Sequence, residues 1–253
     1  MKEEKRKILS QVAYMHFVEG KSQSIIAEEL GIYRTTISRM IKQAREEGVV
    51  EIQIKDFDSK IYALESYIKE MYGLQYINIV PTEYKQSEVD KNQNLAKQAA
   101  DFLKQKIEAN QVVGVSWGST LGNTIANIES KKITSSTFVP IAGGPSHINS
   151  KYHVNTLVYE LARKFGGESV FINATVIQES KRLRDGILNS KYFEQLKQHW
   201  NQLDVAIVGI GGSLYMKDSQ WRDLLTDEDY EDLKLREAVG DCCCRFFDKE
   251  GHV

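Results

Sequence analysis

The feature that most restricts the fold is an alternation, from about Gln75 onward, of short apolar runs with amphipathic segments. This alternation is typical of a parallel β-sheet with helices on both faces. It predicts strands at 76–80, 112–116, 137–142, 170–176 and 205–210. Helices are expected at 88–108, 120–129, 154–165, 191–200 and 227–239. The fold class is therefore α/β, with a Rossmann-like parallel sheet in this part of the chain.

The N-terminal residues have a different pattern, that of a helical hairpin followed by a strand. Ser22 stands as an N-cap for a first helix that Gly31 ends, and a second helix follows from about Tyr33 to Glu47. The next run, 49–54, alternates as a half-buried strand would, and we expect it to form a wing. The hairpin frame itself is Ala27, Gly31 and Ile37: a small residue at the helix contact, a glycine in the turn and an apolar plug.

The second helix of this hairpin is basic and carries short hydroxyl side chains. Between Tyr33 and Arg45 the sequence has Arg or Lys at four positions and no acid. Cations suit phosphates, and short polar groups near a helix N-terminus suit base edges in the major groove. A helical bundle with a merely solvated basic face is the alternative. The residues expected to contact DNA are Ser22, Gln23, Tyr33, Arg34, Thr35, Thr36, Ser38, Arg39 and Lys42.

Composition narrows the class of protein further. The chain has 253 residues, 42% of them hydrophobic, and a formal net charge of −2, so a packed core is feasible and charge must be judged by region. We see no signal-peptide pattern and no apolar run long enough to span a membrane, and therefore expect a cytoplasmic protein. The consecutive Cys242, Cys243 and Cys244 lack the spacing of metal ligands and are expected to be small apolar residues of a strand. No metal, cofactor or catalytic residue is predicted.

Three glycine-bearing turns follow predicted strands. In a parallel sheet such turns gather at the carboxyl ends of the strands, where ligands bind. Glycine lets backbone N–H groups approach an anion, and a helix N-terminus adds a favourable dipole. Steric reasons alone also place glycines after strands. The expected anion-binding residues are Gly118, Ser119, Thr120, Gly143, Gly144, Ser146, Gly211 and Gly212, with Arg184 as a second contact.

Nucleotide-binding patterns are absent from these turns. Neither Gly-x-Gly-x-x-Gly nor the P-loop lysine motif occurs, which disfavours dinucleotides and nucleoside triphosphates. The chain then divides into a helix-turn-helix domain at 1–55, a linker helix at 56–74 and a ligand-binding domain at 75–253. The linker helix has an apolar stripe, formed by Ile61, Leu64, Ile68 and Met71, that fits either self-association or packing against its own domain.

Several stretches together resemble the SorC/DeoR-type sugar-binding regulators of transcription. They include 22–32, 34–39 and 44–50 in the hairpin, and 114–120, 208–211, 240–241 and 245–248 in the α/β part. The resemblance implies a sheet domain similar to sugar-phosphate isomerases, a phosphorylated sugar as effector, a double-stranded DNA operator, and a homodimer or homotetramer on DNA. It gives no role to a membrane.

Two departures from the family pattern matter. Tyr33 stands where the family usually has a serine that caps the recognition helix. The family also continues beyond Val253, through a further Gly-Gly turn and a lysine that helps to bind the effector phosphate. The chain therefore looks shortened, and we expect it to bind phosphosugars weakly or not at all.

Two other functions remain open at this stage. One is an enzyme on the same fold, such as a sugar-phosphate isomerase, which needs a positioned acid and base. His147 and His153 lie near the second glycine turn, but both are expected to be loop residues. The other is a DNA-binding protein whose α/β domain serves only oligomerisation.

Overall fold

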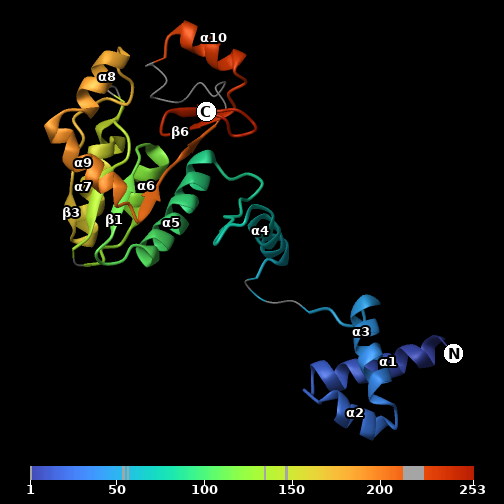
Figure 1. The fold of residues 1–253 in the computed structure, drawn as a ribbon. Helices are drawn as coiled ribbons and strands as arrows, with labels where there is room; N and C mark the ends of the chain where they lie inside the picture. Colours follow the sequence, from blue (N-terminus) through green and yellow to red (C-terminus); the bar gives the residue numbers. More distant parts are fainter. Residues whose placement is uncertain (1, 53–54, 56, 134, 146–147, 213–224) are drawn as a thin grey trace. The chain divides into compact units, whose positions relative to one another are not determined.

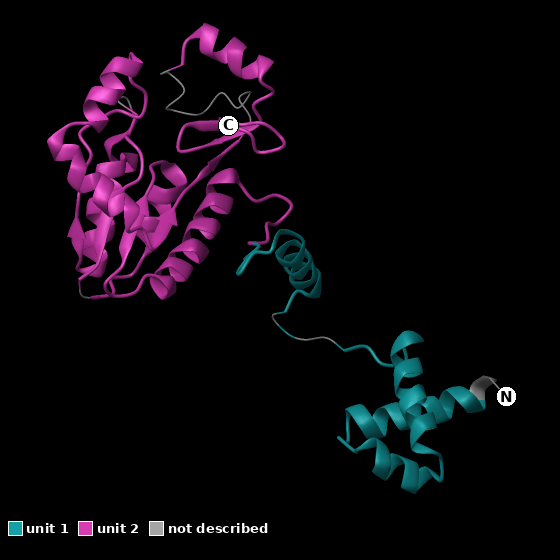
Figure 2. Cartoon of the chain, in the orientation of Figure 1, with its two compact units in different colours: residues 1–79 teal, residues 80–253 magenta. Residues whose placement is uncertain are grey.

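The structure is a computed structural model that describes residues 2–52, 55, 57–133, 135–145, 148–212 and 225–253. It contains two compact units, residues 1–79 and 80–253 (Figure 2). The predicted linker helix, observed as α4 (Ser59–Tyr72), belongs to the first unit. The α/β unit therefore begins a few residues later than the predicted boundary at 75.

The first unit starts with three helices: α1 (Lys2–Phe17), α2 (Gln23–Leu30) and α3 (Arg34–Glu46) (Figure 1). Their buried apolar side chains form one cluster of Val12, Met15, Ile26, Ile37 and Ile41, and a second of Leu9, Ala13 and Ala44. All three helices contribute to this core, which holds the hairpin of α2 and α3 against α1.

The predicted wing strand over 49–54 does not form at the described positions 49–52. The backbone N–H groups of Val49 and Val50 both donate to the carbonyl of Ala44, at 2.8 and 3.1 Å. They complete the end of α3 after Gly48, whose φ of 66° is left-handed. In a strand these N–H groups would donate to a neighbouring strand. Because they already donate to the end of α3, the wing strand does not form here. Residues 53 and 54 lie outside the described part.

The predicted strand over 76–80 is also not a strand in the structure. The N–H of Ile79 donates instead to Oε1 of Glu65 on α4, at 2.7 Å. The apolar run is present as expected, but no strand of the described chain pairs with it. Apolar composition alone therefore overpredicted a strand here.

The second unit is built on a parallel sheet of four strands in the order β3-β2-β1-β4. These are β1 (Val112–Val115), β2 (Thr137–Pro140), β3 (Glu168–Ser169) and β4 (Val205–Ile207). Val113 of β1 is in register with Phe138 of β2 and Val205 of β4. The prediction of an α/β parallel sheet is confirmed. The chain moves outward from β1 to β3 and then crosses back to β4, so the strand order reverses beside β1.

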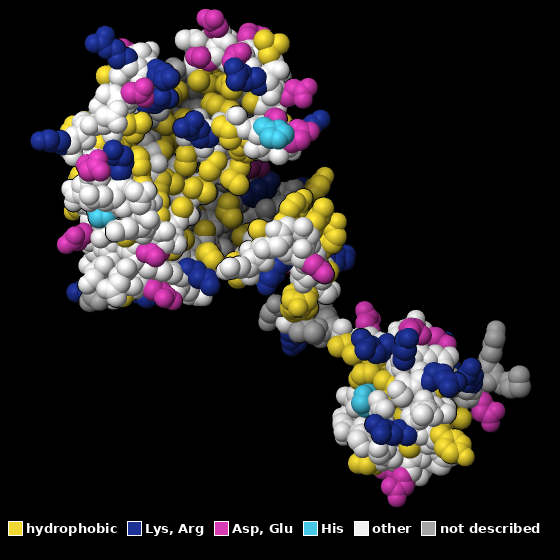
Figure 3. Space-filling model, in the orientation of Figure 1, with side chains coloured by type: hydrophobic (Ala, Val, Ile, Leu, Met, Phe, Trp, Pro, Cys, Tyr) yellow, Lys and Arg dark blue, Asp and Glu magenta, His cyan; other side chains and the backbone are white. Residues whose placement is uncertain are grey.

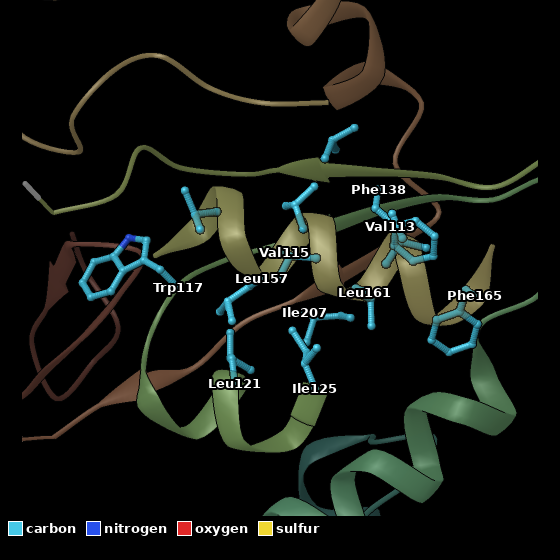
Figure 4. Packing of buried hydrophobic residues seen from close by; sticks show 14 of the residues in the cluster. Val113, Val115, Trp117, Leu121, Ile125, Phe138, Leu157, Leu161, Phe165 and Ile207 are labelled. Carbon is cyan, nitrogen blue, oxygen red and sulfur yellow. The ribbon is translucent and has the colours of Figure 1, made fainter. Parts of the chain in front are cut away.

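Helices cover both faces of this sheet. Because parallel crossovers are right-handed, α6 (Ser119–Asn127) and α7 (Val154–Phe165) lie on one face, and α9 (Lys191–Asn201) lies on the other. Figure 4 shows side chains of α6 and α7 pointing into one apolar layer with Val115 and Ile207. The preceding helix, α5 (Glu88–Lys106), packs beside α6.

Several elements differ from their predicted extents. The predicted strand 170–176 is not a strand in the structure: β3 (Glu168–Ser169) ends just before it, and only an isolated bridge between Gly144 and Thr175 falls within it. The run 205–210 breaks after β4, and β5 (Ile210–Gly211) joins a separate antiparallel sheet with β6 (Gly240–Cys242) and β7 (Arg245–Phe247). The structure adds α8 (Lys181–Leu188) and the short helix η1 (Ser150–Tyr152), which were not predicted. The predicted helix at 227–239 ends earlier, as α10 (Asp227–Leu235).

The three cysteines were predicted to lie in one strand, but only the first of them does. Cys242 ends β6, and Cys243 and Cys244 are the two residues of the turn to β7, because Cys242 pairs with Arg245. Their φ angles are 53° and 59°, as in the two-residue hairpin turns that match the twist of a strand pair. Left-handed backbone is rare for residues other than glycine and asparagine, so the sequence gave no turn signal here.

Candidate functional site

The helix hairpin of the first unit has the geometry that the sequence frame predicted. The hydroxyl of Ser22 accepts a hydrogen bond from the N–H of Ile25, at 3.4 Å, and so caps α2. Gly31 adopts a φ of 64° in the turn, and the N–H of Ile32 donates to the carbonyl of Ala27. Ile37 is completely buried between the helices. The α2–α3 pair therefore has the two helices, the glycine turn and the buried isoleucine that the sequence frame predicted.

The outward face of α3 carries the residues expected to read DNA. Arg34, Thr35, Ser38, Arg39 and Lys42 are exposed, and Thr36 is half-buried toward α1. Lys42 lies 3.7 Å from Glu46, one turn further along. Glu46 therefore lies on the same exposed side of α3 as Lys42. Both side chains of this pair are well exposed, so the pair contributes little and leaves the lysine able to move.

Tyr33 precedes α3 without capping it. Its side chain makes no hydrogen bond to the first turn and is 86% exposed. The first N–H groups of α3 therefore lack the side-chain acceptor that a serine or aspartate would supply. Ser22 and Gln23, at the start of α2, complete the predicted set. The Ser22 hydroxyl already serves as a cap, and Gln23 is half-buried.

The second unit contains a cavity of about 370 Å³ at the carboxyl ends of β1 and β4. In an open parallel sheet, ligands bind where the strand order reverses, because the loops after the two strands diverge there. The order β3-β2-β1-β4 places that point between β1 and β4. The cavity is lined by Ser116, Trp117, Gly118, Ser119, Thr120, Leu121, Ile148, Tyr152, Gly209, Ile210, Gly211, Asp241 and Cys243.

One wall of the cavity is the start of α6. Gly118 precedes the helix with φ 130° and ψ 162°, a conformation that L side chains rarely adopt, and its N–H donates to the carbonyl of Tyr152 at 3.2 Å. This bond fixes the wall but occupies the glycine N–H. The N–H groups of Ser119, Thr120 and Leu121 begin the helix, where no intrahelical acceptor exists. The Ser119 and Thr120 side chains are exposed beside them.

The second glycine turn does not line this cavity. A Cβ on Gly143 would stand 2.6 Å from the backbone of Ala174, and one on Gly144 would stand 2.5 Å from Nε2 of His153. These glycines allow close packing between neighbouring segments, which was the steric alternative. His153 in turn caps α7, since its Nδ1 accepts from the N–H of Asn155 at 3.3 Å. The predicted site residue Ser146, and His147, lie outside the described residues.

Two further predicted residues are also not among those lining the cavity. Gly212 follows β5 and is exposed, while Gly211 does line the cavity. Arg184 lies on α8, where its guanidinium is paired with Asp185 at 2.7 Å. Among the described residues that line the cavity there is no lysine or arginine. The structure therefore places the start of α6 at the cavity and Arg184 away from its lining.

Sequence reasoning missed Asp241 and Cys243, which reach the cavity from the β6–β7 hairpin. The Asp241 side chain is buried, with 5% exposure, and its Oδ2 accepts from the N–H of Cys244 at 3.3 Å. The thiol of Cys243 donates to the hydroxyl of Ser116 at 3.4 Å, across 127 residues of sequence. Gly211 approaches this hairpin so closely that a Cβ on it would stand 2.0 Å from Oδ1 of Asp241.

Burial raises the pKa of two thiols of the hairpin, those of Cys242 and Cys244. Burial, and then the charge of Asp241, raise the pKa of Cys244 to about 12. The pKa of Cys242 is also raised, first by burial and then by Cys243. Because the thiolate is the nucleophile and the metal ligand, these two cysteines are poorly suited to either role.

One group of potential metal ligands occurs in the described chain: Asp248, Glu250 and His252. Both oxygens of Asp248 already serve the local turn, accepting from the N–H groups of Glu250 and His252 at 3.0 and 2.8 Å and lying 3.2 Å from the His252 ring. These bonds explain the cluster as a turn, and it lies apart from the cavity lining. Among the described helices, none has the length and apolarity that crossing a membrane requires.

Comparisons with known proteins place the chain among regulators. The family of sugar-binding domains matches residues 59–253. The sorbitol operon regulator of Klebsiella pneumoniae is 33% identical over 248 residues, covering 97% of this chain and 78% of that protein. The deoxyribonucleoside regulator of Bacillus subtilis is 27% identical over 256 residues, covering 100% of this chain and 80% of that protein.

Solved structures agree with the sequence comparisons. The full-length sorbitol operon regulator SorC from Klebsiella pneumoniae aligns with a TM-score of 0.72 at 32% identity, covering 98% of this chain and 81% of that one. A transcriptional regulator from Streptococcus pneumoniae TIGR4 aligns with a TM-score of 0.73 at 46% identity, covering 78% and 75%.

A helix-turn-helix unit joined to a sheet unit with a cavity at its switch point is the plan of a ligand-controlled regulator of transcription. The matched proteins named above are all regulators, and none of them is an isomerase. The chain belongs to the SorC family of sugar-binding transcriptional regulators.

Proposed function

We propose that this regulator binds an operator through the exposed face of α3 and responds to a phosphorylated sugar held in the cavity beside α6. The observation that supports the ligand class most strongly is the position of the α6 N-terminus. The start of α6 lines the cavity. It brings together there the two exposed hydroxyls of Ser119 and Thr120 and the first backbone N–H groups of the helix, which have no intrahelical acceptor. That arrangement suits an anion with several oxygen acceptors.

The phosphate belongs at the start of α6 and not beside Asp241. Backbone N–H groups and the helix dipole favour a negative charge there, typically by about 0.3–1 kcal/mol and by ~2 kcal/mol where the site is partly buried. The buried carboxylate of Asp241 would repel a dianion. A carboxylate is, however, a strong acceptor for sugar hydroxyls, so the polyhydroxyl part of the ligand belongs on that side.

The remaining lining residues suit a small carbohydrate. Trp117, Tyr152, Ile148 and Leu121 supply apolar surface for the C–H groups of the ligand. Ser116 and Cys243 form a polar corner between β1 and the hairpin. A volume of about 370 Å³ is at the lower end for small-molecule sites and fits one sugar unit with a phosphate.

The experiment is a thermal-shift screen of sugars with and without a phosphate group, followed by calorimetry on the compound that stabilises the chain most. We expect phosphorylated sugars to raise the melting temperature more than their unphosphorylated forms. Thr120→Glu should weaken binding by at least ~1.4 kcal/mol, or tenfold, because it puts a negative charge at the phosphate position.

Ala126→Glu provides the matched control, since Ala126 is exposed further along α6 and does not line the cavity. It should bind like the unmutated chain. Equal binding of the phosphorylated sugar by Thr120→Glu and Ala126→Glu would contradict the proposed phosphate position. Equal shifts by phosphorylated and unphosphorylated sugars would contradict the ligand class.

The proposal includes self-association through α4. No residue of α4 is fully buried, and its stripe of Ile61, Leu64, Ile68 and Met71 includes two residues that are 48% and 59% exposed, Leu64 and Met71. Figure 3 shows hydrophobic side chains on the visible surface in the region of α4. A helix that leaves its apolar stripe open fits pairing with a second copy, as a homodimer or as part of a homotetramer, and two copies suit a palindromic operator.

A further inference from the structure

We propose that the DNA-contacting surface extends beyond α3 onto the first turns of α1, where Lys5 and Arg6 bind the phosphate backbone that flanks the major groove. This inference rests on the proposed function, since it names a further part of the operator-binding surface. It comes from a groove that runs between α1 and α3 and that the helix-turn-helix pattern does not predict.

The groove has a volume of about 780 Å³. Its lining residues are Lys5, Arg6, Ile8, Leu9, Ile32, Thr36, Arg39, Met40, Gln43 and Glu47. Two of them, Thr36 and Arg39, are in the set expected to read DNA from α3. The groove therefore borders the proposed DNA-reading face directly, and its opposite wall is α1.

The charge of the residues that line the groove indicates which kind of ligand binds there. Three cations line the groove, and in the part of the chain that the structure describes, none of Lys5, Arg6 and Arg39 is in an ion pair. Its one carboxylate, Glu47, already accepts from the amide of Gln43 at 2.6 Å. Lys5 and Arg6 are exposed, so they can reach a polyanion without losing an existing partner. A DNA strand presents such charge at each phosphate, which makes the sugar-phosphate backbone the matching ligand.

Phosphate contacts and base contacts have different signatures. A phosphate contact weakens binding about equally on every sequence and reduces the slope of log K against log salt by about 0.9. A base contact changes discrimination between sequences. Lys5 and Arg6 should have the first signature, whereas Arg39, on the outward face of α3, should also affect discrimination.

The test uses the full chain and two duplexes of equal length: one selected by the unmutated chain from a random-sequence library, and one unrelated. Fluorescence anisotropy gives the affinity for each at several salt concentrations. We expect Lys5→Ala with Arg6→Ala to lower the affinity for both duplexes by a similar factor and to reduce the salt slope by about two. Arg39→Ala should lower the affinity for the selected duplex more than for the unrelated one.

Lys7→Ala is the matched control, because Lys7 is an exposed cation of the same helix that does not line the groove. It should change the salt slope by less than half as much as the double variant. A double variant with the slope of Lys7→Ala, in a chain that still selects its duplex, would overturn this inference and leave the proposed function standing. An unmutated chain that binds neither duplex would overturn both. Circular dichroism melts show whether each variant is folded.

Discussion

Gly211 and Asp241 both line the cavity and lie directly against each other. A Cβ at Gly211 would stand 2.0 Å from Oδ1 of a carboxylate that is 5% exposed, so Gly211→Ala has to displace a buried charge. Overpacking of this kind typically costs about 1–3 kcal/mol. We expect Gly211→Ala to lower the free energy of unfolding within that range and to weaken sugar binding, as measured by urea unfolding and calorimetry.

Gly186→Ala gives the comparison for this prediction. Gly186 lies on α8, away from the cavity lining, and a Cβ there would meet nothing within 4 Å. Because alanine favours helix over glycine, this variant should be as stable as the unmutated chain or slightly more stable. A Gly211→Ala chain that unfolds at the same urea concentration as Gly186→Ala would show that the Asp241 carboxylate moves at no cost.

His153 makes the stability of the α/β unit depend on pH. Its burial lowers its pKa below the ordinary value of 6.5, and its neutral ring accepts the capping bond at the start of α7. The unfolded chain therefore takes up this proton at a higher pH than the folded one. The stabilisation is complete above pH 6.5 and is lost as the pH falls from there through the folded pKa.

The measurement for His153 is the free energy of unfolding at several pH values between neutrality and pH 5. His153→Asn keeps a capping side chain but cannot take up a proton in this range. We expect the unmutated chain to lose more stability on acidification than His153→Asn does. Parallel profiles for the two chains would show that His153 has no part in the acid sensitivity.

At the scale of single residues, the sequence predicted only the local part of the cavity. Gly118, Ser119 and Thr120 follow a strand and open a helix within a few positions, so the pattern was visible in one stretch of sequence. Asp241 and Cys243 come from a hairpin more than 120 residues away, and their turn uses left-handed cysteines instead of the usual Asn-Gly. No local signal could connect them to β1.

At the scale of elements, helices were predicted better than strands. The predicted helix 154–165 is α7 without change, and 191–200 is α9 to within one residue. The runs 49–54 and 76–80 have strand composition but form no strand in the described residues. A helix satisfies its own backbone, whereas a strand exists only where a second segment arrives to pair with it.

The α4 helix allows a prediction about assembly. Charging its open stripe with Leu64→Glu and Met71→Glu should shift the chain toward monomer, because carboxylates would have to be buried in the pair of helices. Sedimentation velocity over a range of concentrations measures this. Ala63→Glu with Ser66→Glu adds the same charges to exposed positions off the stripe and should leave the association unchanged. A chain that is already monomeric at high micromolar concentration would contradict the role given to α4.

At the scale of the whole molecule, the two units give a prediction about coupling. If the cavity controls DNA binding, the sugar must change the DNA affinity, and DNA must change the sugar affinity by the same factor. Couplings of this kind are typically about 5- to 150-fold. Both factors can be measured by titrating the selected duplex with and without saturating phosphosugar, and the phosphosugar with and without duplex.

Thr120→Glu separates coupling from DNA binding. Its change lies in the α/β unit, so the variant should bind the selected duplex with the affinity of the sugar-free chain and should no longer respond to the sugar. A response to the sugar that survives in Thr120→Glu would mean that the ligand acts from a different place on the molecule.

The pairing of β1 with β4 also has a consequence for how the protein folds. The N–H of Val112 donates to Oδ2 of Asp204 at 2.8 Å, across 92 residues of sequence. Such a long-range closure loses chain entropy before it gains contacts, and topologies with many such closures fold slowly. The cavity between these strands cannot exist in a chain where β4 has not yet joined the sheet. A ligand that binds in this cavity can therefore stabilise only molecules in which β4 has already joined the sheet.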